Sequence, residues 1–253
     1  MQMKTPTPQT RLYVDFTLKS DQKYEINKHQ SHYLLHVLRL NEGAYLSVFN
    51  GHDGEWLAKI CHTHKKTVFI ETIKIIKEQT NLFQVSLCFA PLKKTHTDIL
   101  VSQATEMGVT EFLPFTSDFS HTKRTNTDRL KATATEAAEL SERLDVPHFY
   151  ELQPLEKLLS EWPEDKQLFF CDEARDGEFL FSSFEKQKKR GTLSSNIAFL
   201  IGPEGGFSER ERNYLQDHKA VYNVQLGNRV MRADTAAICA LSIWHAFSTY
   251  CDL

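Results

Sequence analysis

Residues 202–208, with the sequence Gly-Pro-Glu-Gly-Gly-Phe-Ser, have the composition of a ligand-binding loop. They follow the apolar run 196–201 and lead into a segment where Ser208 and Glu211 have the spacing of a helix capping box. Ligands of open α/β sheets bind beyond the carboxyl ends of strands, and glycine lets the backbone approach them closely. The sequence therefore favours a binding loop over the alternative, a tight strand-to-helix turn.

This loop lacks the signatures of the common nucleotide sites. It has neither the Gly-Lys-Ser/Thr ending of a P-loop nor the G-x-G-x-x-G pattern of dinucleotide sites. Ser208 is not surrounded by G-x-S-x-G, so we interpret it as a helix cap and not as a nucleophile. Triphosphate and dinucleotide ligands are disfavoured.

A second polar loop, residues 226–236, has the sequence Leu-Gly-Asn-Arg-Val-Met-Arg-Ala-Asp-Thr-Ala. Arg229 and Arg232 stand three positions apart, and Asp234 follows closely. Two arginines at the mouth of a sheet suit an anionic substrate or one that develops negative charge. Alternatively, Arg232 pairs with Asp234 and stiffens the loop, and both interpretations can hold together.

Both loops lie in a region where strands and helices alternate. Apolar runs predict strands at 85–90, 111–115, 168–171, 197–201 and 221–226. Helical spacing predicts a helix that ends at Gly108, one over 128–143 and one over 235–250. This alternation is typical of a parallel α/β sheet covered on both faces, which we assign to residues 82–253.

The first 76 residues read as a small β-barrel domain. Runs rich in β-branched and aromatic residues predict strands at 44–49, 55–60 and 67–73. The turn sequence Asn-Gly-His-Asp-Gly at 50–54 separates the first two, and residues 32–39 have helical spacing. The polar residues 77–81 form the expected linker.

Composition limits the class of protein. With 41% hydrophobic and 25% charged residues, the chain can bury a full core as a soluble globular protein. We expect no membrane span and no secretory signal. Five scattered cysteines without a C-x-x-C pair disfavour a zinc site and a disulfide framework, and they favour the reducing cytoplasm.

Charge is distributed unevenly along the chain. The net charge is −3, but residues 1–79 hold 11 Lys and Arg against 8 Asp and Glu. A basic small region beside an acidic larger one is typical of an accessory domain that meets phosphate. On charge alone, ordinary scatter is the stronger interpretation.

Taken together, these motifs resemble the ribosomal RNA small subunit methyltransferase E family of the SPOUT superfamily. The two loops are the most specific part of the resemblance, which extends over nearly the whole chain. Further matching segments lie at 11–13, 32–40, 103–109, 136–139 and 146–147, together with Arg143.

The resemblance implies a fold, a reaction and partners. The expected fold is a C-terminal SPOUT domain with a parallel sheet and a deep trefoil knot, preceded by a small PUA-like β-barrel that binds RNA. The expected reaction is transfer of a methyl group from S-adenosylmethionine to N3 of a uridine in 16S ribosomal RNA. The expected partners are this RNA or the small ribosomal subunit and a second copy of the chain, with no membrane and no metal. The implied cofactor-binding residues are Leu200, Ile201, Gly202, Pro203, Glu204, Gly205, Leu226, Gly227, Arg229, Val230, Met231, Thr235 and Ala236.

Uracil N3 carries a proton and is a poor nucleophile until that proton leaves. The site therefore needs a base, or a cation that stabilises the resulting imide anion. Our hypothesis is that Arg232 stabilises the anion, while Glu204 or Asp234 helps to deprotonate or to position the uracil. Arg229 is expected to order the loop or to contact phosphate.

Other basic residues are candidates for RNA contact. The clustered histidines of the first 64 residues lack metal-ligand spacing, and we expect them to be exposed. The candidate RNA contacts are Arg11, Arg39, Lys93, Lys94, Lys123, Arg124 and Arg143.

The chain departs from the family pattern at several polar positions. Gln103 replaces a lysine, Asp118 and Phe119 stand where an arginine is common, and Leu140 replaces a glutamine. Asp234 replaces a glutamate. Two alternatives therefore stay open: a knotted methyltransferase that acts on another RNA nucleotide, and a non-catalytic RNA-binding assembly protein.

Overall fold

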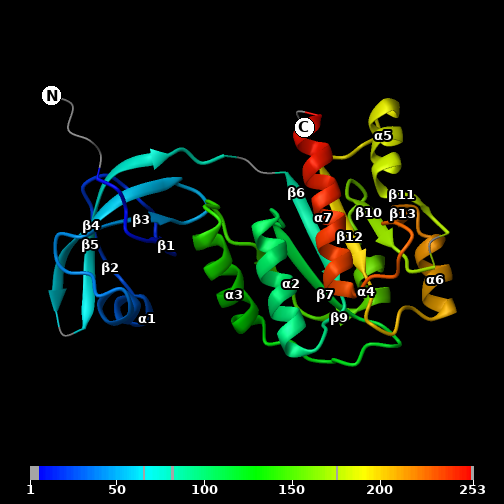
Figure 1. The fold of residues 1–253 in the computed structure, drawn as a ribbon, viewed down its shortest axis with the longest axis horizontal. Coiled ribbons are helices and arrows are strands. Elements are labelled where there is room, and N and C mark those ends of the chain that lie inside the picture. The colour runs from blue at the N-terminus through cyan, green and yellow to red at the C-terminus, as the bar shows by residue number, and fades with distance from the viewer. Residues whose placement is uncertain (1–5, 65, 81–82, 175, 252–253) are drawn as a thin grey trace. The chain divides into compact units, whose positions relative to one another are not determined.

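The computed structural model describes residues 6–64, 66–80, 83–174 and 176–251, except for the side chain of Lys94 (Figure 1). The chain divides into two compact units. Unit 1 contains Met1–Asn81 and Ala138–Val146, and unit 2 contains Leu82–Ala137 and Pro147–Leu253.

Unit 1 is built on a mainly antiparallel sheet with the strand order β1-β3-β4-β5-β2. Among its described strands, only β1 and β3 pair in parallel. The predicted strands are confirmed, but two extend further than expected because they form a long hairpin. Residue Lys77 of the expected linker consequently belongs to β5. The predicted helical patch is an α-helix that continues as one π-helical turn. The elements are β1 (Arg11–Tyr13), β2 (Lys23–Glu25), α1 (Lys28–His32), η1 (Tyr33–Val37), β3 (Tyr45–Phe49), β4 (Glu55–His64) and β5 (Thr67–Lys77).

Unit 2 contains the predicted parallel sheet. Its described strands follow the order β11-β13-β10-β12-β6-β7-β8, every neighbouring pair is parallel, and β9 also pairs with β7. The strands are β6 (Gln84–Phe89), β7 (Glu111–Thr116), β8 (His148–Phe149), β9 (Gln153–Pro154), β10 (Gln167–Cys171), β11 (Glu178–Phe179), β12 (Asn196–Ile201) and β13 (Val221–Gln225).

The helices of unit 2 also follow the predicted alternation. The helix expected to reach residue 143 ends at Leu140, and Glu142 has a φ of 60°, which no α-helix accommodates. The helices are α2 (Lys94–Glu106), α3 (Thr127–Leu140, whose last residues belong to unit 1), α4 (Leu155–Ser160), α5 (Leu180–Arg190), α6 (Glu209–Gln216) and α7 (Ala233–Tyr250).

Alternating side chains of the central strands build a core on each face of the sheet. Phe170 of β10 and Leu200 of β12 are buried in a cluster with residues of α4 and α6. Phe169 and Phe199 point the other way, toward Phe184 of α5, and the ring centroids of Phe169 and Phe184 lie 4.9 Å apart. Helices on both faces leave the strand ends as the place for a ligand.

On the second face, α7 packs against α2, α5 and β12 (Figure 1). This packing fixes the first turn of α7 beside the first turn of α2. In the described part of the chain, no helix combines the length and the apolar character that a membrane span requires.

Candidate functional site

A cavity of about 290 Å³ lies at the carboxyl ends of three adjacent strands of unit 2, β10, β12 and β13. β10 lies between the other two in the sheet, so the segments that follow all three strands meet. The lining residues are Cys171, Asp172, Glu173, Ile201, Gly202, Pro203, Glu204, Gly206, Phe207, Leu226, Gly227, Arg229, Val230, Met231, Arg232, Ala233 and Ala236.

Most of the residues predicted for cofactor binding line this cavity, and three do not. Leu200 is fully buried in the core, and Thr235 is exposed on α7. Gly205 is exposed, and a Cβ added to it would lie 3.0 Å from Cβ of Phe119. The predicted residues that line the cavity are Ile201, Gly202, Pro203, Glu204, Leu226, Gly227, Arg229, Val230, Met231 and Ala236.

At two positions of the loop after β12, the backbone geometry or the packing requires glycine. A Cβ at Gly202 would collide with the ring of Phe207, which is buried and stacks on Phe115. Gly206 has a φ of 69°, a conformation that side chains rarely adopt. The glycine density of this loop therefore serves its own close packing as well as access to the cavity.

The acidic pair that follows β10 was not among the predicted site residues. Arg212 of α6 forms ion pairs with Asp172 and with Glu173, the latter at 2.8 Å. The other carboxylate oxygen of Asp172, Oδ2, is buried and finds no hydrogen-bond partner among the described residues. A carboxylate directly after an apolar strand is the signal that could have revealed it. Its buried free oxygen suits a ligand that carries a cation or a hydroxyl group.

Arg232 and Asp234 start α7 at the rim of the cavity. Arg232 is exposed and lines the cavity, and its Nε lies 3.8 Å from Oδ1 of Asp234, so the predicted pair forms at long range. Burial acts to raise the pKa of Asp234, but hydrogen bonds from His96 and the backbone N–H of Thr235, with the charge of Arg232, hold it below its usual range. Asp234 is therefore ionised at neutral pH. His96 was missed because its contact crosses 138 positions of sequence.

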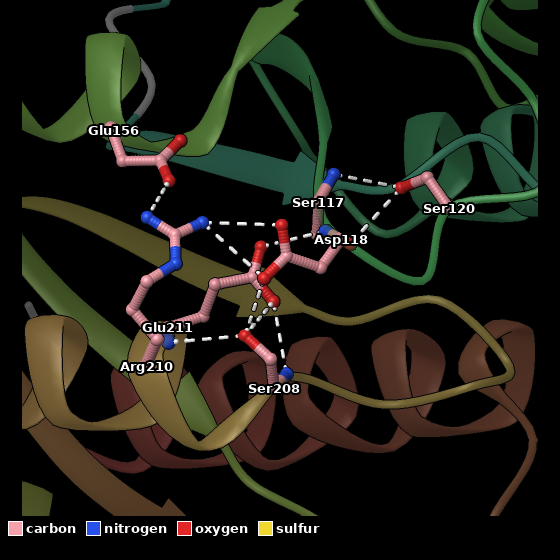
Figure 2. A network of polar contacts seen from close by, with 7 residues as sticks. All are labelled: Ser117, Asp118, Ser120, Glu156, Ser208, Arg210 and Glu211. Carbon is pink, nitrogen blue, oxygen red and sulfur yellow. Dashed lines mark hydrogen bonds and ion pairs between the residues drawn. The ribbon is translucent and has the colours of Figure 1, made fainter.

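The loop after β12 is anchored by the loop after β7, as Figure 2 shows. The Ser208 hydroxyl donates to Asp118 Oδ2 at 2.6 Å, and the backbone N–H of Asp118 donates to Glu211 at 2.8 Å. Arg210 pairs with both Asp118 and Glu156. Asp118, which departs from the family pattern, thus fixes the start of α6.

Replacing Ser208 with alanine is expected to lower the free energy of unfolding by about 1 kcal/mol, the usual cost of losing a helix N-cap. The predicted capping box with Glu211 is present, and the variant loses it together with the bond to Asp118. Urea unfolding followed by circular dichroism measures this loss. Ser182→Ala, at an exposed position of α5, is the matched control and should unfold like the wild type. Equal stability of the two variants would contradict the capping role.

The structure separates the described side chains of the predicted RNA contacts into an exposed group and a group held inside unit 1. Arg39, Lys93, Lys123 and Arg124 are exposed, whereas the side chain of Lys94 lies outside the described part of the chain.

Arg11 and Arg143 are held inside unit 1, contrary to the expectation of surface cations. Arg11 pairs with Glu55 at 2.8 Å and donates to the backbone carbonyl of Arg143 at 2.8 Å. Arg143 is buried and pairs with Asp145 at 2.7 Å. Because these contacts use both guanidinium groups for packing, we remove both residues from the candidate RNA surface.

Two family descriptions match the sequence. Residues 78–245 match the RNA methyltransferase domain, and residues 26–73 match the RNA methyltransferase PUA domain. Two similar proteins are named ribosomal RNA small subunit methyltransferase E. The one from Rickettsia conorii is 28% identical over 96% of this chain and 97% of its own length. The one from Synechocystis is 30% identical over 84% of this chain and 69% of its own length.

Solved structures share the fold over nearly the whole chain. A putative methyltransferase from Legionella pneumophila in complex with S-adenosylmethionine has a TM-score of 0.81 at 24% identity and covers 95% of this chain and 98% of its own. A ribosomal RNA small subunit methyltransferase E from Neisseria gonorrhoeae bound to S-adenosylmethionine has a TM-score of 0.79 at 22% identity, with 95% and 97% covered. These likenesses support the two-part α/β architecture described above.

Proposed function

The chain belongs to the ribosomal RNA small subunit methyltransferase E family, and from this premise we propose that it transfers a methyl group from S-adenosylmethionine to N3 of a uridine in 16S ribosomal RNA. The observation that carries this proposal is the cavity at the ends of β10, β12 and β13. Two of its three walls are the loops on which the family resemblance depends most strongly.

The residues that line the cavity fit this methyl donor. Gly202 and Gly227 leave the backbone accessible. The buried Oδ2 of Asp172 has no hydrogen-bond partner in the described part of the chain, and a polar or cationic group of the donor would supply one. Ile201, Leu226 and Met231 offer apolar contacts beside these polar groups, a mixture typical of cofactor sites. When bound, the donor supplies an electrophilic methyl group to the reaction.

The protein must align the uracil and manage its N3 proton. Arg232 lies on the cavity wall with an exposed guanidinium group, a position from which it stabilises negative charge on the uracil oxygens. Glu204 is exposed on the loop after β12 and helps to position the uracil, while Asp234 remains ionised beside Arg232. Arg229 orders the loop or contacts phosphate.

The remaining expectations belong to the same proposal. The chain threads a deep trefoil knot through the segments that carry the two loops, and it acts as a homodimer. Its partner is 16S ribosomal RNA or the small subunit, which places the reaction in the cytoplasm. Arg39, Lys93, Lys123 and Arg124 are the exposed cations that we assign to RNA contact.

Mapping of N3-methyluridine in small-subunit ribosomal RNA, from cells with and without this gene, tests the proposal. We expect one such mark to disappear without the gene and to return with the wild-type chain. An unchanged mark would reject this reaction. Calorimetry with S-adenosylmethionine would then separate the two alternatives. Retained binding favours another target nucleotide, and lost binding favours a non-catalytic assembly protein.

A further inference from the structure

The packing of α7 against α2 builds a histidine–carboxylate pair beside the cavity. Nδ1 of His96, in the first turn of α2, lies 3.0 Å from Oδ2 of Asp234, in the first turn of α7. Arg232, Ala233 and Ala236, which flank Asp234 in the sequence, all line the cavity. The pair therefore adjoins the wall that carries the proposed anion-stabilising arginine.

The surroundings of Asp234 fix how the imidazole is oriented. The side chain of Asp234 is only 11% exposed, and its Oδ1 already accepts a hydrogen bond from the backbone N–H of Thr235 at 2.8 Å. Because the carboxylate is ionised, it accepts the hydrogen bond from Nδ1–H of His96. A neutral imidazole held in this way carries its free lone pair on Nε2.

Nε2 of His96 is available to a substrate. The side chain of His96 is 39% exposed, and among the residues that the structure describes, no group forms a hydrogen bond with Nε2. A carboxylate that orients an imidazole whose other nitrogen is free is the arrangement that enzymes use to position a proton acceptor.

We propose that His96, oriented by Asp234, is the general base that accepts the N3 proton of the target uridine. This assignment rests on the proposed function and gives Asp234 the positioning role. The N3–H bond breaks, its proton moves to Nε2, and the electron pair stays on N3. That pair then forms the N3–CH₃ bond while the bond between the methyl carbon and sulfur breaks and its electrons remain on sulfur. Arg232 offsets the negative charge of the imide in between.

Two substitutions separate proton transfer from simple charge pairing. His96→Asn keeps a polar side chain but cannot accept the proton, and His96→Arg keeps a cation opposite Asp234 but has no basic lone pair at neutral pH. In single-turnover methylation of small subunits by the full chain, both variants should lose 100-fold to 10,000-fold in rate. Their dissociation constants for S-adenosylmethionine, measured by calorimetry, should stay within about twofold of the wild type because His96 does not line the cavity.

Chemical rescue provides the second measurement. Free imidazole should restore part of the rate of His96→Ala and should leave the wild-type rate unchanged. His245→Asn, at an exposed position of α7, is the matched control and should methylate like the wild type.

The outcomes distinguish this assignment from the proposed function. A wild-type rate in His96→Arg, or a rate of His96→Ala that imidazole does not raise, would reduce His96 to an ion-pair partner and overturn the assignment alone. Failure of the wild-type chain to methylate any uridine would overturn both the assignment and the function.

Discussion

Replacing Arg232 with alanine is expected to lower kcat for uridine methylation by about 100-fold to 1000-fold, the usual cost of removing one group that stabilises a developing anion. The side chain of Arg232 is 74% exposed, and its Nε lies 3.8 Å from Oδ1 of Asp234, so the fold loses little when the side chain is removed. Steady-state kinetics on small subunits measures the change in kcat, and calorimetry measures the affinity for S-adenosylmethionine. We expect the donor affinity to change by less than about threefold.

Arg229→Ala is the matched control for this experiment, since Arg229 lies on the same loop and also lines the cavity. If Arg229 orders the loop or contacts phosphate, its removal should raise KM and leave kcat within a factor of about three. Full turnover by Arg232→Ala, with unchanged donor binding, would reject the role of Arg232 in stabilising the anion.

The second large effect concerns the stability of unit 2. Lys166, just before β10, pairs with Glu111 of β7 at 2.6 Å, and the side chains are only 8% and 20% exposed. Ser86 of β6 donates to the same carboxylate and accepts from Lys166. Lys166→Met leaves the largely buried carboxylate of Glu111 charged and without its cation. This should lower the free energy of unfolding by about 3–5 kcal/mol. Urea unfolding at neutral pH measures this loss.

Two further variants identify the cause of that loss. Adding Glu111→Gln to Lys166→Met removes the stranded charge and should restore more than half of the lost stability. Lys219→Met breaks the exposed pair with Glu164 and should cost less than about 1 kcal/mol. If the double variant were as unstable as Lys166→Met, lost packing and not a stranded charge would be the explanation.

Acid should change the size of this effect. Burial acts to raise the pKa of Glu111, but its hydrogen bonds with Lys166 and Ser86 hold it below the ordinary value of 4.5. This pair therefore contributes fully above pH 4.5, and its contribution falls as the pH drops through the lowered pKa. In Lys166→Met, burial without the cation raises the pKa of Glu111, and protonation of Glu111 then removes the unpaired buried charge. The stability difference between wild type and variant should therefore begin to shrink above pH 4.5, as Glu111 of the variant takes up its proton, and should shrink further as the pH falls through the lowered pKa of the wild type.

The loops and strands of unit 2 could be predicted because their signals are local. Apolar runs located the strands, and the two polar loops after β12 and β13 located two of the three walls of the cavity. The position of Asp172 directly after an apolar strand is a local signal, but nothing local places β10 between β12 and β13, so the sequence did not assign Asp172 and Glu173 to the cavity. His96 depends on a contact between two helices at opposite ends of the unit's sequence. Sheet order and helix packing, which are global properties, decide these residues.

The same limit explains the mistaken surface assignment in unit 1. Arginine is mostly exposed in proteins, and neither Arg11 nor Arg143 carries a local sign of burial. Glu55, the partner of Arg11, comes from a distant part of the sequence. Asp145, the partner of Arg143, is only two positions away, but a neighbouring carboxylate does not show that the pair is buried. Long charged side chains are buried where such partners exist, and a single sequence does not show which ones will meet.

Because the cavity has three walls from separate segments, the methyl donor can bind only after unit 2 has folded completely. The walls come from segments near residues 171–173, 201–207 and 226–236, so the cavity is complete only once the last helix has joined the sheet. A chain that lacks this helix has no site to occupy. A donor that binds only the finished unit stabilises it by mass action, by about 1.4 kcal/mol for each tenfold excess over its Kd. The cellular supply of the donor would then influence how long the folded enzyme persists, in addition to how fast it works.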